Sequence, residues 1–382
     1  MSKKEIAPEK HEHAHSGFVH LHVHSEYSVL DGQSKIYEIL DRCERYGMRA
    51  CALTDHGALF GALEFYQAAR KKGIKPIIGS ELYVAKGSRF EKSGRAGQSN
   101  NHFLLLCESD EGYHNLCKLS SYGYTEGFHY KPRVDLELLV KHKAGLIATS
   151  ACLAGEIPQF LLNDNVDAAN ESIKKYVEIY GRDNFLIELM DHGLPEQIKI
   201  NPILAELAEH HGLMIIATND CHYTDKEDSV SHEALLAIQT QATLDQEDRF
   251  RFPTPEFYFR SGEEMAERFK QFPAAITNTE KVAARCNVEL KVGGQLVPHY
   301  VPPAGFEKEA YLRHLVTEGL NERYANAPSA DFVARANFEL DIIVQMGFTD
   351  YFLVVWDLIA FARSKGIPVG PGRGSGAGSL VA

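Results

Sequence analysis

The sequence lacks the features that would place the protein in a membrane or outside the cell. No run of about 18 apolar residues occurs, so no segment is expected to span a membrane. The N-terminus, Met1-Ser-Lys-Lys-Glu, has no apolar core of a secretory signal. The 7 cysteines form neither a CxxC pair nor a disulfide framework, which is typical of reduced thiols. We therefore expect a cytoplasmic protein without a membrane partner.

The sequence also has fewer basic than acidic residues. The chain has 40 Lys and Arg against 52 Asp and Glu, a net charge of −12. Bulk electrostatic coating of nucleic acid is therefore not expected, although local binding through metal ions and a basic groove is compatible with this charge. The hydrophobic fraction of 44% is ordinary for a globular protein, and 382 residues permit two domains or one barrel with an attachment.

Between residues 18 and 240, apolar runs typical of strands alternate with segments of helical spacing. The expected strands are 18–24, 50–54, 76–84, 102–107, 145–149, 184–190 and 213–218. The expected helices are 34–46, 58–72, 112–122, 165–180, 195–211 and 226–240. Such alternation predicts an α/β fold with a parallel sheet, and at this length a closed or nearly closed barrel. In barrels of this kind the active site lies at the C-terminal ends of the strands.

The first expected strand, Phe18-Val-His-Leu-His-Val-His-Ser25, has a histidine at every second position. Alternate side chains of a strand point the same way, so His20, His22 and His24 are expected on one face. The competing interpretation is a polar strand edge with chance histidines. Similar clusters after later apolar runs favour a metal site.

Side chains that bind metals also stand at or near the ends of the later strands. They are Asp31, Asp55, His56, Glu81, His102, Cys152, Asp220 and His222. Singly, each is more often a cap or a core hydrogen-bonding group. Together they need cations for neutralisation, and this mixture of nitrogen and oxygen donors suits Zn²⁺, Mn²⁺ or Fe²⁺ better than Ca²⁺. So many ligands suit two or three ions, which is typical of phosphoester hydrolysis.

The segments HLHVHSEYS, LDG, TDHG, IIGSE, NHFLLL, SACLAGEIPQ and ATNDCHYT resemble the polymerase and histidinol phosphatase (PHP) domain. The closer resemblance is to that domain at the N-terminus of the C-family bacterial replicative polymerases, the DNA polymerase III alpha subunits, and it runs from about residue 18 to the end. It implies a distorted (β/α)7 barrel with a trinuclear metal centre. The implied ligands are His22, His24, Asp31, His56, Glu81, His102, Cys152, Asp220 and His222. Asp55 would orient an imidazole, and His20 falls outside the set.

The resemblance further implies a metal-dependent 3′–5′ exonuclease able to proofread. Some members of the family have lost several ligands and keep the domain as a scaffold, whereas this sequence keeps all of them. We expect His22, His24, Asp220 and His222 to carry catalysis, with two or three Zn²⁺, Mn²⁺ or Fe²⁺ ions. Three further residues stand at another strand end: Glu188, Asp191 and His192. They could assist the substrate or the ligands of this site, or they could have a structural role.

The sequence changes character after residue 285. Helices are expected over 332–346 and 351–365, the second carrying the only tryptophan, before the glycine-rich run IPVGPGRGSGAGS. Glycines let the backbone approach phosphate closely and arginine binds it bidentately, but no Walker A motif is present. The alternative is a flexible linker. The predicted phosphate-binding residues are Gly372, Arg373, Gly374, Ser375, Gly376, Gly378 and Ser379.

This run resembles the C-family palm motif that binds the triphosphate of the incoming nucleotide. We accordingly expect a flexible tail over 1–16, a nuclease domain over 17–285 and the incomplete start of a palm over 286–382. The palm's Mg²⁺-binding aspartates would follow Ala382, so polymerisation on primer-template DNA with dNTPs is expected only of a longer protein, whose missing part would contact the sliding clamp and clamp loader. The alternatives are a stand-alone histidinol-phosphatase-type phosphoesterase and a non-catalytic structural platform. The glycine-rich run weighs against the first, and the complete ligand set weighs against the second.

Overall fold

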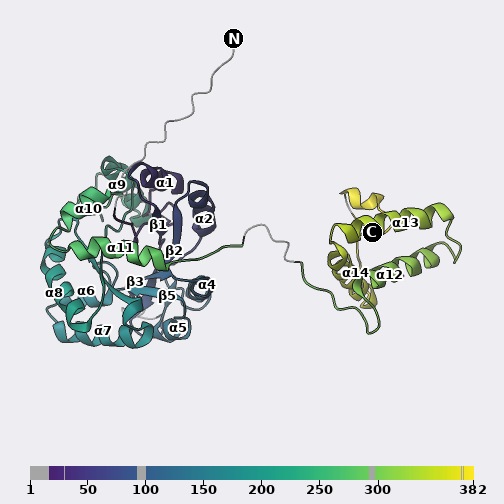
Figure 1. The fold of residues 1–382 in the computed structure, drawn as a ribbon, viewed down its shortest axis with the longest axis horizontal. Coiled ribbons are helices and arrows are strands. Elements are labelled where there is room, and N and C mark those ends of the chain that lie inside the picture. The colour runs from purple at the N-terminus through teal and green to yellow at the C-terminus, as the bar shows by residue number, and fades with distance from the viewer. Residues whose placement is uncertain (1–16, 30, 93–99, 292–296, 371, 373) are drawn as a thin grey trace, which may run out of the picture. The chain divides into compact units, whose positions relative to one another are not determined.

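In the computed structural model the chain divides into two compact units, Met1–Leu290 and Lys291–Ala382. The structure describes residues 17–29, 31–92, 100–291, 297–370, 372 and 374–382. The expected tail, 1–16, and the predicted phosphate ligand Arg373 lie outside the described residues. Figure 1 labels the helices of both units and several of the strands.

A curled sheet forms the centre of the first unit, with helices around it (Figure 1). Its strands follow the order β1-β2-β3-β5-β6-β7, and β4 pairs with β2. Their bounds are β1 Ala50–Leu53, β2 Lys75–Ala85, β3 Asn100–Cys107, β4 Arg133–Val134, β5 Leu146–Thr149, β6 Phe185–Met190 and β7 Ile215–Thr218. The expected α/β class is confirmed.

The expectation of an all-parallel sheet is wrong at β3. This strand runs antiparallel to both β2 and β5, whereas β1 and β2, β5 and β6, and β6 and β7 pair in parallel. Parallel neighbours need a crossover connection, usually a helix. No helix lies in the described part of the connection from β2 to β3, residues 86–92, and the sequence there is rich in glycine, serine and basic residues.

The histidine-bearing segment 18–24 is not a regular strand, since it bends at His22 and forms one isolated bridge, from Val23 to Cys221. It nevertheless hydrogen-bonds to both ends of the sheet. On the β1 side, Ala52 N–H donates to His20 O at 2.8 Å, and beyond β7, His24 N–H donates to Cys221 O at 2.8 Å. These bonds link the two ends of the curled sheet into a barrel.

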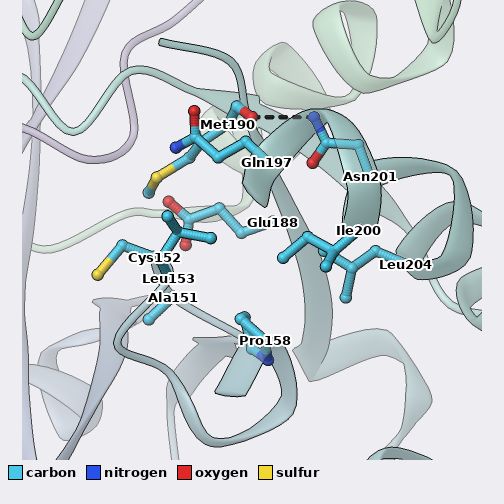
Figure 2. A pocket seen from close by; sticks show the side chains of 10 residues that line it. All are labelled: Ala151, Cys152, Leu153, Pro158, Glu188, Met190, Gln197, Ile200, Asn201 and Leu204. Atoms are coloured by element: carbon cyan, nitrogen blue, oxygen red, sulfur yellow. Dashed lines mark hydrogen bonds between the residues drawn. The ribbon is translucent and has the colours of Figure 1, made fainter. Parts of the chain in front are cut away.

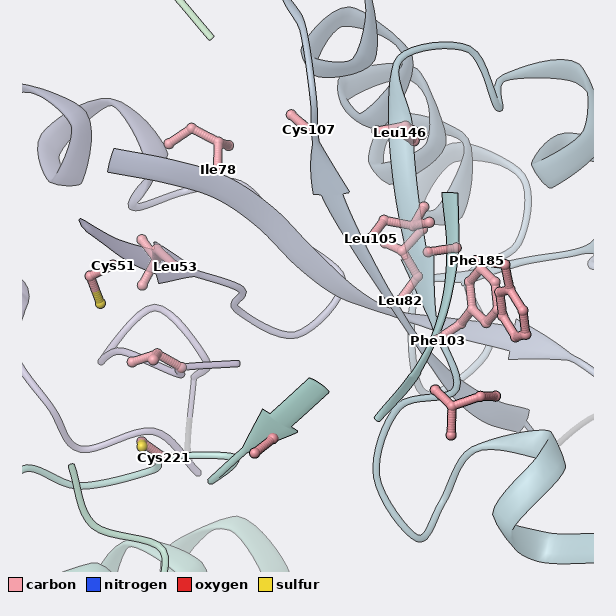
Figure 3. Packing of buried hydrophobic residues seen from close by; sticks show 14 of the residues in the cluster. Cys51, Leu53, Ile78, Leu82, Phe103, Leu105, Cys107, Leu146, Phe185 and Cys221 are labelled. Atoms are coloured by element: carbon pink, nitrogen blue, oxygen red, sulfur yellow. The ribbon is translucent and has the colours of Figure 1, made fainter. Parts of the chain in front are cut away.

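Two apolar layers hold the barrel together. Inward-facing side chains from the strands form one cluster with Leu21, and helix α11 closes its end through Val282. Outward-facing side chains pack between the sheet and the helices, and Figure 3 shows this layer around Phe103 and Phe185. Leu21 belongs to the inner cluster and Val23 to the outer one, so the strict alternation expected of 18–24 is interrupted there.

The helices of the first unit match the expected ones closely, except for four that the sequence did not indicate, α5, α6, α10 and α11; in the second unit, the first helix was not indicated either. The bounds in the first unit are α1 Ile36–Arg45, α2 Ala62–Lys71, α4 Asp110–Thr125, α5 Leu136–Lys141, α6 Glu156–Leu162, α7 Val166–Tyr180, α8 Pro195–His211, α9 Ser229–Thr240, α10 Gly262–Arg268 and α11 Pro273–Arg285.

The second unit is helical. Its helices are α12 Lys308–Arg323, α13 Ala330–Gln345 and α14 Thr349–Ser364. A small core around Leu312, Leu340 and Leu353 holds them together. Among the described residues no single helix is long and apolar enough to cross a membrane; α13 and α14 meet the length and composition of a span only as a pair, bent by 115°.

Candidate metal centre

The structure brings the predicted ligand side chains into one contiguous cluster. They come from segment 18–24 and its following loop, from the ends of β1, β5 and β7, and from positions within β2 and β3. Three sets of side chains each have ligand atoms within 4.8 Å of one another: His22 with His24 and Asp220, His24 with His56 and His222, and His56 with Glu81 and His102.

The first set is the most deeply buried. The Nε2 atoms of His22 and His24 lie 3.1 Å apart. Asp220 Oδ1 lies 3.3 Å from the first of them and 3.2 Å from the second. Both histidines are wholly buried. The two imidazole nitrogens and one carboxylate oxygen thus converge on one point.

Glu81 connects this set to the other ligands. Its Oε1 lies 2.9 Å from His102 Nδ1 and 3.5 Å from Cys152 Sγ, and its Oε2 lies 2.9 Å from His56 Nδ1. Asp31 Oδ2 reaches the far nitrogen of His56 at 3.4 Å. Glu81 Oε1 also lies 3.6 Å from His22 Nε2, so one carboxylate on β2 faces donors from four other segments.

The ring of His222 stacks on His24, with centroids 4.5 Å apart and planes 29° from parallel. Its Nδ1–H donates to the carbonyl of Asp220 at 2.8 Å, which leaves Nε2 for another partner. Asp220 itself has a φ of +41°, and Ala151, next to Cys152, has a φ of +58°. Left-handed backbone at non-glycine residues costs free energy and tends to occur at functional sites.

Several buried acceptors in the cluster have no hydrogen-bond partner among the described residues. They are Asp31 Oδ1, Glu81 Oε2 and Asp220 Oδ1, and His56 Nδ1 is also unsatisfied. Glu81 Oε2 lies 2.9 Å from His56 Nδ1, and Asp220 Oδ1 lies 3.2 Å from His24 Nε2, but neither contact has the geometry of a hydrogen bond. Buried polar atoms are normally hydrogen-bonded, so unsatisfied lone pairs on three converging carboxylates need a cation. The donor set of imidazole nitrogens, carboxylate oxygens and one thiol fits Zn²⁺, Mn²⁺ or Fe²⁺.

The pKa values of the imidazoles in the cluster are shifted in opposite directions. Burial, with the neighbouring imidazoles, lowers the pKa of His24 to about 3. Burial also acts to lower the pKa of His22, but the surrounding carboxylates, Asp220 first, outweigh it and raise that pKa well above its ordinary value. Asp31 outweighs burial in the same way at His56 and raises its pKa to about 10. Metal binding to such a cluster must displace these protons.

Glu188, on β6, is the closest supporting side chain. Its Oε1 accepts from His22 Nδ1 at 2.7 Å, and the hydroxyls of Thr149 and Thr218 both donate to the same carboxylate at 2.5 Å. Figure 2 shows Glu188 beside Cys152 at a cavity of about 10 Å³, which has room for roughly one water molecule.

The other two members of that strand-end group lie outside the cluster. Asp191 Oδ1 lies 3.7 Å from Arg268, and His192 stacks on Phe257 with ring centroids 3.8 Å apart. Likewise His20 is in none of the three sets, because its Nε2 hydrogen-bonds to the carbonyl of Arg260 at 2.8 Å.

Asp55 makes no hydrogen bond or ion pair with an imidazole in the described part of the chain. It accepts from Ser28 Oγ at 2.8 Å, and Ser28 Oγ in turn lies 2.9 Å from His24 Nδ1, so Asp55 acts on that imidazole through the serine. His232, on α9, was not indicated by the sequence. Its Nε2 hydrogen-bonds to the carbonyl of Asp31 at 2.7 Å, and no motif or strand end marks its position.

In the second unit the predicted phosphate-binding run forms a short 3-10 turn over Gly374–Gly378. No described atom lies within 4 Å of a Cβ built on Gly372, Gly374, Gly376 or Gly378, so these glycines are not required by packing. Ser375 is exposed. Ser379 donates its hydroxyl to Glu339 on α13 at 2.7 Å.

Two family descriptions match the chain. Residues 20–192 match the PHP domain, and residues 310–382 match the bacterial DNA polymerase III alpha NTPase domain. The chain is 49% identical over 371 residues to the DNA polymerase III subunit alpha of Treponema pallidum, covering 97% of this chain and 32% of that protein. It is 45% identical to the subunit from Borreliella burgdorferi, covering 96% and 32%.

The chain thus spans about a third of the length of these relatives. Among solved structures, an amidohydrolase from Chromobacterium violaceum is 18% identical in sequence, with a TM-score of 0.36. The matched region covers 65% of this chain and 96% of the amidohydrolase chain. A likeness of that degree bears on neither mechanism nor substrate.

Proposed function

This chain is a PHP-domain relative of the bacterial DNA polymerase III alpha subunits, and on that basis we propose that its first unit is a metal-dependent 3′–5′ exonuclease. The observation that supports this most is the cluster of converging donors, in which three buried carboxylate oxygens make no hydrogen bond with any described residue. A phosphodiester is the substrate that such a cluster suits, because its negative charge needs the same cations.

Nine side chains would hold two or three divalent ions: His22, His24, Asp31, His56, Glu81, His102, Cys152, Asp220 and His222. Bound ions would activate water and neutralise charge on the scissile phosphodiester. The protein's part is to fix the donors. Glu188 accepts from His22 Nδ1 and so directs Nε2 into the cluster, while Ser28 does the same for His24. The carboxylate of Glu81 lies between the donor sets.

The role proposed for the second unit rests on its match to the bacterial DNA polymerase III alpha NTPase domain. We propose that its glycine-rich run, Gly372–Ser379, contributes to binding the phosphates of an incoming nucleotide. The corresponding whole protein would be a cytoplasmic DNA polymerase that acts with Mg²⁺ on primer-template DNA and dNTPs, together with a sliding clamp and a clamp loader.

Metal content and hydrolysis measured together test the exonuclease. The purified chain should contain two or three divalent ions, and it should remove 3′-terminal nucleotides from a mismatched primer until a chelator is added. His24→Ala and Asp220→Ala should each lose metal and hydrolysis together. Asp191→Asn is the matched control, because it changes a strand-end acid outside the cluster and should leave both unchanged.

Two outcomes would contradict the proposal. Hydrolysis that persists in both alanine variants would place the chemistry elsewhere. Metal that is bound without any cleavage of the primer would favour a structural platform.

A further inference from the structure

Four aromatic side chains are exposed on one surface of the first unit, which we call the rim aromatics: Phe60, Tyr124, Phe128 and Tyr130. Their exposed fractions are 60%, 40%, 48% and 73%. They come from the loop before α2, the end of α4 and the turn before β4. Large apolar side chains gathered on a surface usually mark a binding site.

Three of the rings follow one another. The centroids of Phe60 and Tyr124 are 5.9 Å apart, and those of Tyr124 and Phe128 are 6.2 Å apart with planes only 19° from parallel. Tyr130 has a φ of +60° in a turn closed by a hydrogen bond from His129 N–H to Lys131 O. A bulky residue in the left-handed region is strained, and such strain is concentrated at functional sites.

This surface adjoins the candidate metal centre. Ser120, on α4, donates its hydroxyl to the carbonyl of Gly57, the residue after the predicted ligand His56, at 2.9 Å. Tyr83, on β2, connects Lys131 to the metal centre. Its ring stacks on His56 with centroids 5.6 Å apart, and Lys131 Nζ lies 5.1 Å from the centroid of the same ring.

Lys131 places a positive charge near the aromatic side chains. Its ammonium group makes no ion pair or hydrogen bond with any residue the structure describes, unlike Arg89 nearby, which pairs with Glu126 and Asp135. In a chain with a net charge of −12, an unpaired cation beside a metal centre is available to an anionic ligand.

We propose that the rim aromatics stack the unpaired bases of a single-stranded DNA 3′ end, while Lys131 binds a backbone phosphate and leads the terminal phosphodiester to the metal centre. This inference rests on the proposed exonuclease function. Stacking on aromatic rings combined with backbone charge is how proteins bind single strands without reading sequence, which suits an enzyme that removes any nucleotide. The position of Lys131 favours DNA over a protein partner, because it places a positive charge beside Tyr83, whose ring stacks on the predicted ligand His56.

Binding to a fluorescent single-stranded oligonucleotide tests the surface. Anisotropy titrations in the presence of a chelator keep the strand intact and separate binding from hydrolysis. Tyr124→Leu and Phe128→Leu keep apolar bulk but lose the ring, and each should weaken binding roughly fivefold or more, since stacking contributes about 1–3 kcal/mol per base. Tyr124→Phe keeps the ring and should bind as the parent does.

Two further variants test whether a loss of DNA affinity is specific to this surface. Ile198→Ala, at an exposed apolar position on α8, should leave DNA affinity unchanged. Lys131→Gln should weaken binding and reduce the slope of log affinity against log salt by about 0.7, the contribution of one phosphate contact to a single strand.

Hydrolysis of bis(p-nitrophenyl) phosphate distinguishes the two proposals, because this small diester has no strand to stack. The leucine variants should hydrolyse it at the parent rate while they lose DNA affinity. If the parent binds DNA through the rings but cleaves no diester, the exonuclease proposal fails and the DNA-binding surface stands. If the leucine variants bind DNA as well as the parent, or the parent binds none, the inference is overturned and a protein contact is the better explanation of the exposed rings.

Discussion

Glu188 illustrates at the scale of single residues how a buried carboxylate controls a metal ligand. It accepts from His22 Nδ1 and is itself held by two threonine hydroxyls. A carboxylate in this position fixes the tautomer of the imidazole and increases its basicity. Removing its charge should therefore weaken metal binding without removing any ligand.

We predict that Glu188→Gln lowers metal affinity roughly 10- to 100-fold, the usual effect of losing such a partner. Metal content after equilibration at fixed free Zn²⁺ or Mn²⁺ measures it. Thr218→Val, which removes one hydrogen bond but keeps the carboxylate, should have a smaller effect. Unchanged metal affinity in Glu188→Gln would mean that the contact with His22 is structural only.

Most of the proposed ligands could be predicted to meet because they follow strands whose ends share one mouth of a barrel, whereas Glu81 and His102 lie within β2 and β3. The contacts that hold these ligands in place could not be predicted. That Asp55 acts through Ser28, and that His232 holds the backbone of Asp31, depends on side-chain directions between segments far apart in sequence. Glu188 stayed open for the same reason.

At the scale of secondary structure, periodicity predicted most of the long helices, except α11 and α12, and six of the seven strands of the sheet, because apolar spacing reports which face is buried. It did not predict strand direction. The antiparallel placement of β3 depends on a connection without a helix in its described part, and an apolar strand has the same spacing in either direction. Helix α11 was missed because the side chains by which it closes the barrel include small ones such as Ala283, which give a weak apolar signal.

The contact between α13 and the end of the chain should depend on pH. Burial acts to raise the pKa of Glu339, but Val381 N–H, the Ser379 hydroxyl and Arg335 outweigh it and lower the pKa from 4.5 to about 2. A pKa that is lower in the folded state gives stability that is present above the unfolded value and is lost as the pH falls towards the folded one. We therefore predict that this contribution disappears between about pH 4.5 and pH 2.

Urea unfolding of the second unit at a series of acid pH values measures this effect, and Trp356 fluorescence is the probe. Glu339→Gln should be less stable than the parent at pH 6 and should flatten the pH dependence below pH 4.5. A variant whose stability follows the same pH curve as the parent would show that Glu339 does not titrate in this range.

At the scale of the whole molecule, the two units have different sources of stability. The first has a large barrel core and a cluster of buried carboxylates and imidazoles that are poorly satisfied without cations. The second is a small helical unit with its own core and with no cluster of metal-binding side chains among the residues described. Metal should therefore stabilise one unit and not the other.

We predict that removing metal with a chelator lowers the melting temperature of the first unit only. An ion that binds only the folded state adds about 2.7 kcal/mol when its concentration is 100 times its dissociation constant, and two or three ions would add correspondingly more. Far-UV circular dichroism follows mainly the first unit, while Trp356, the only tryptophan, reports the second alone. The circular dichroism transition should move to lower temperature with chelator while the fluorescence transition stays in place. Equal shifts in both signals would mean that the two units unfold as one, and no shift in either would mean that the buried cluster does not bind metal.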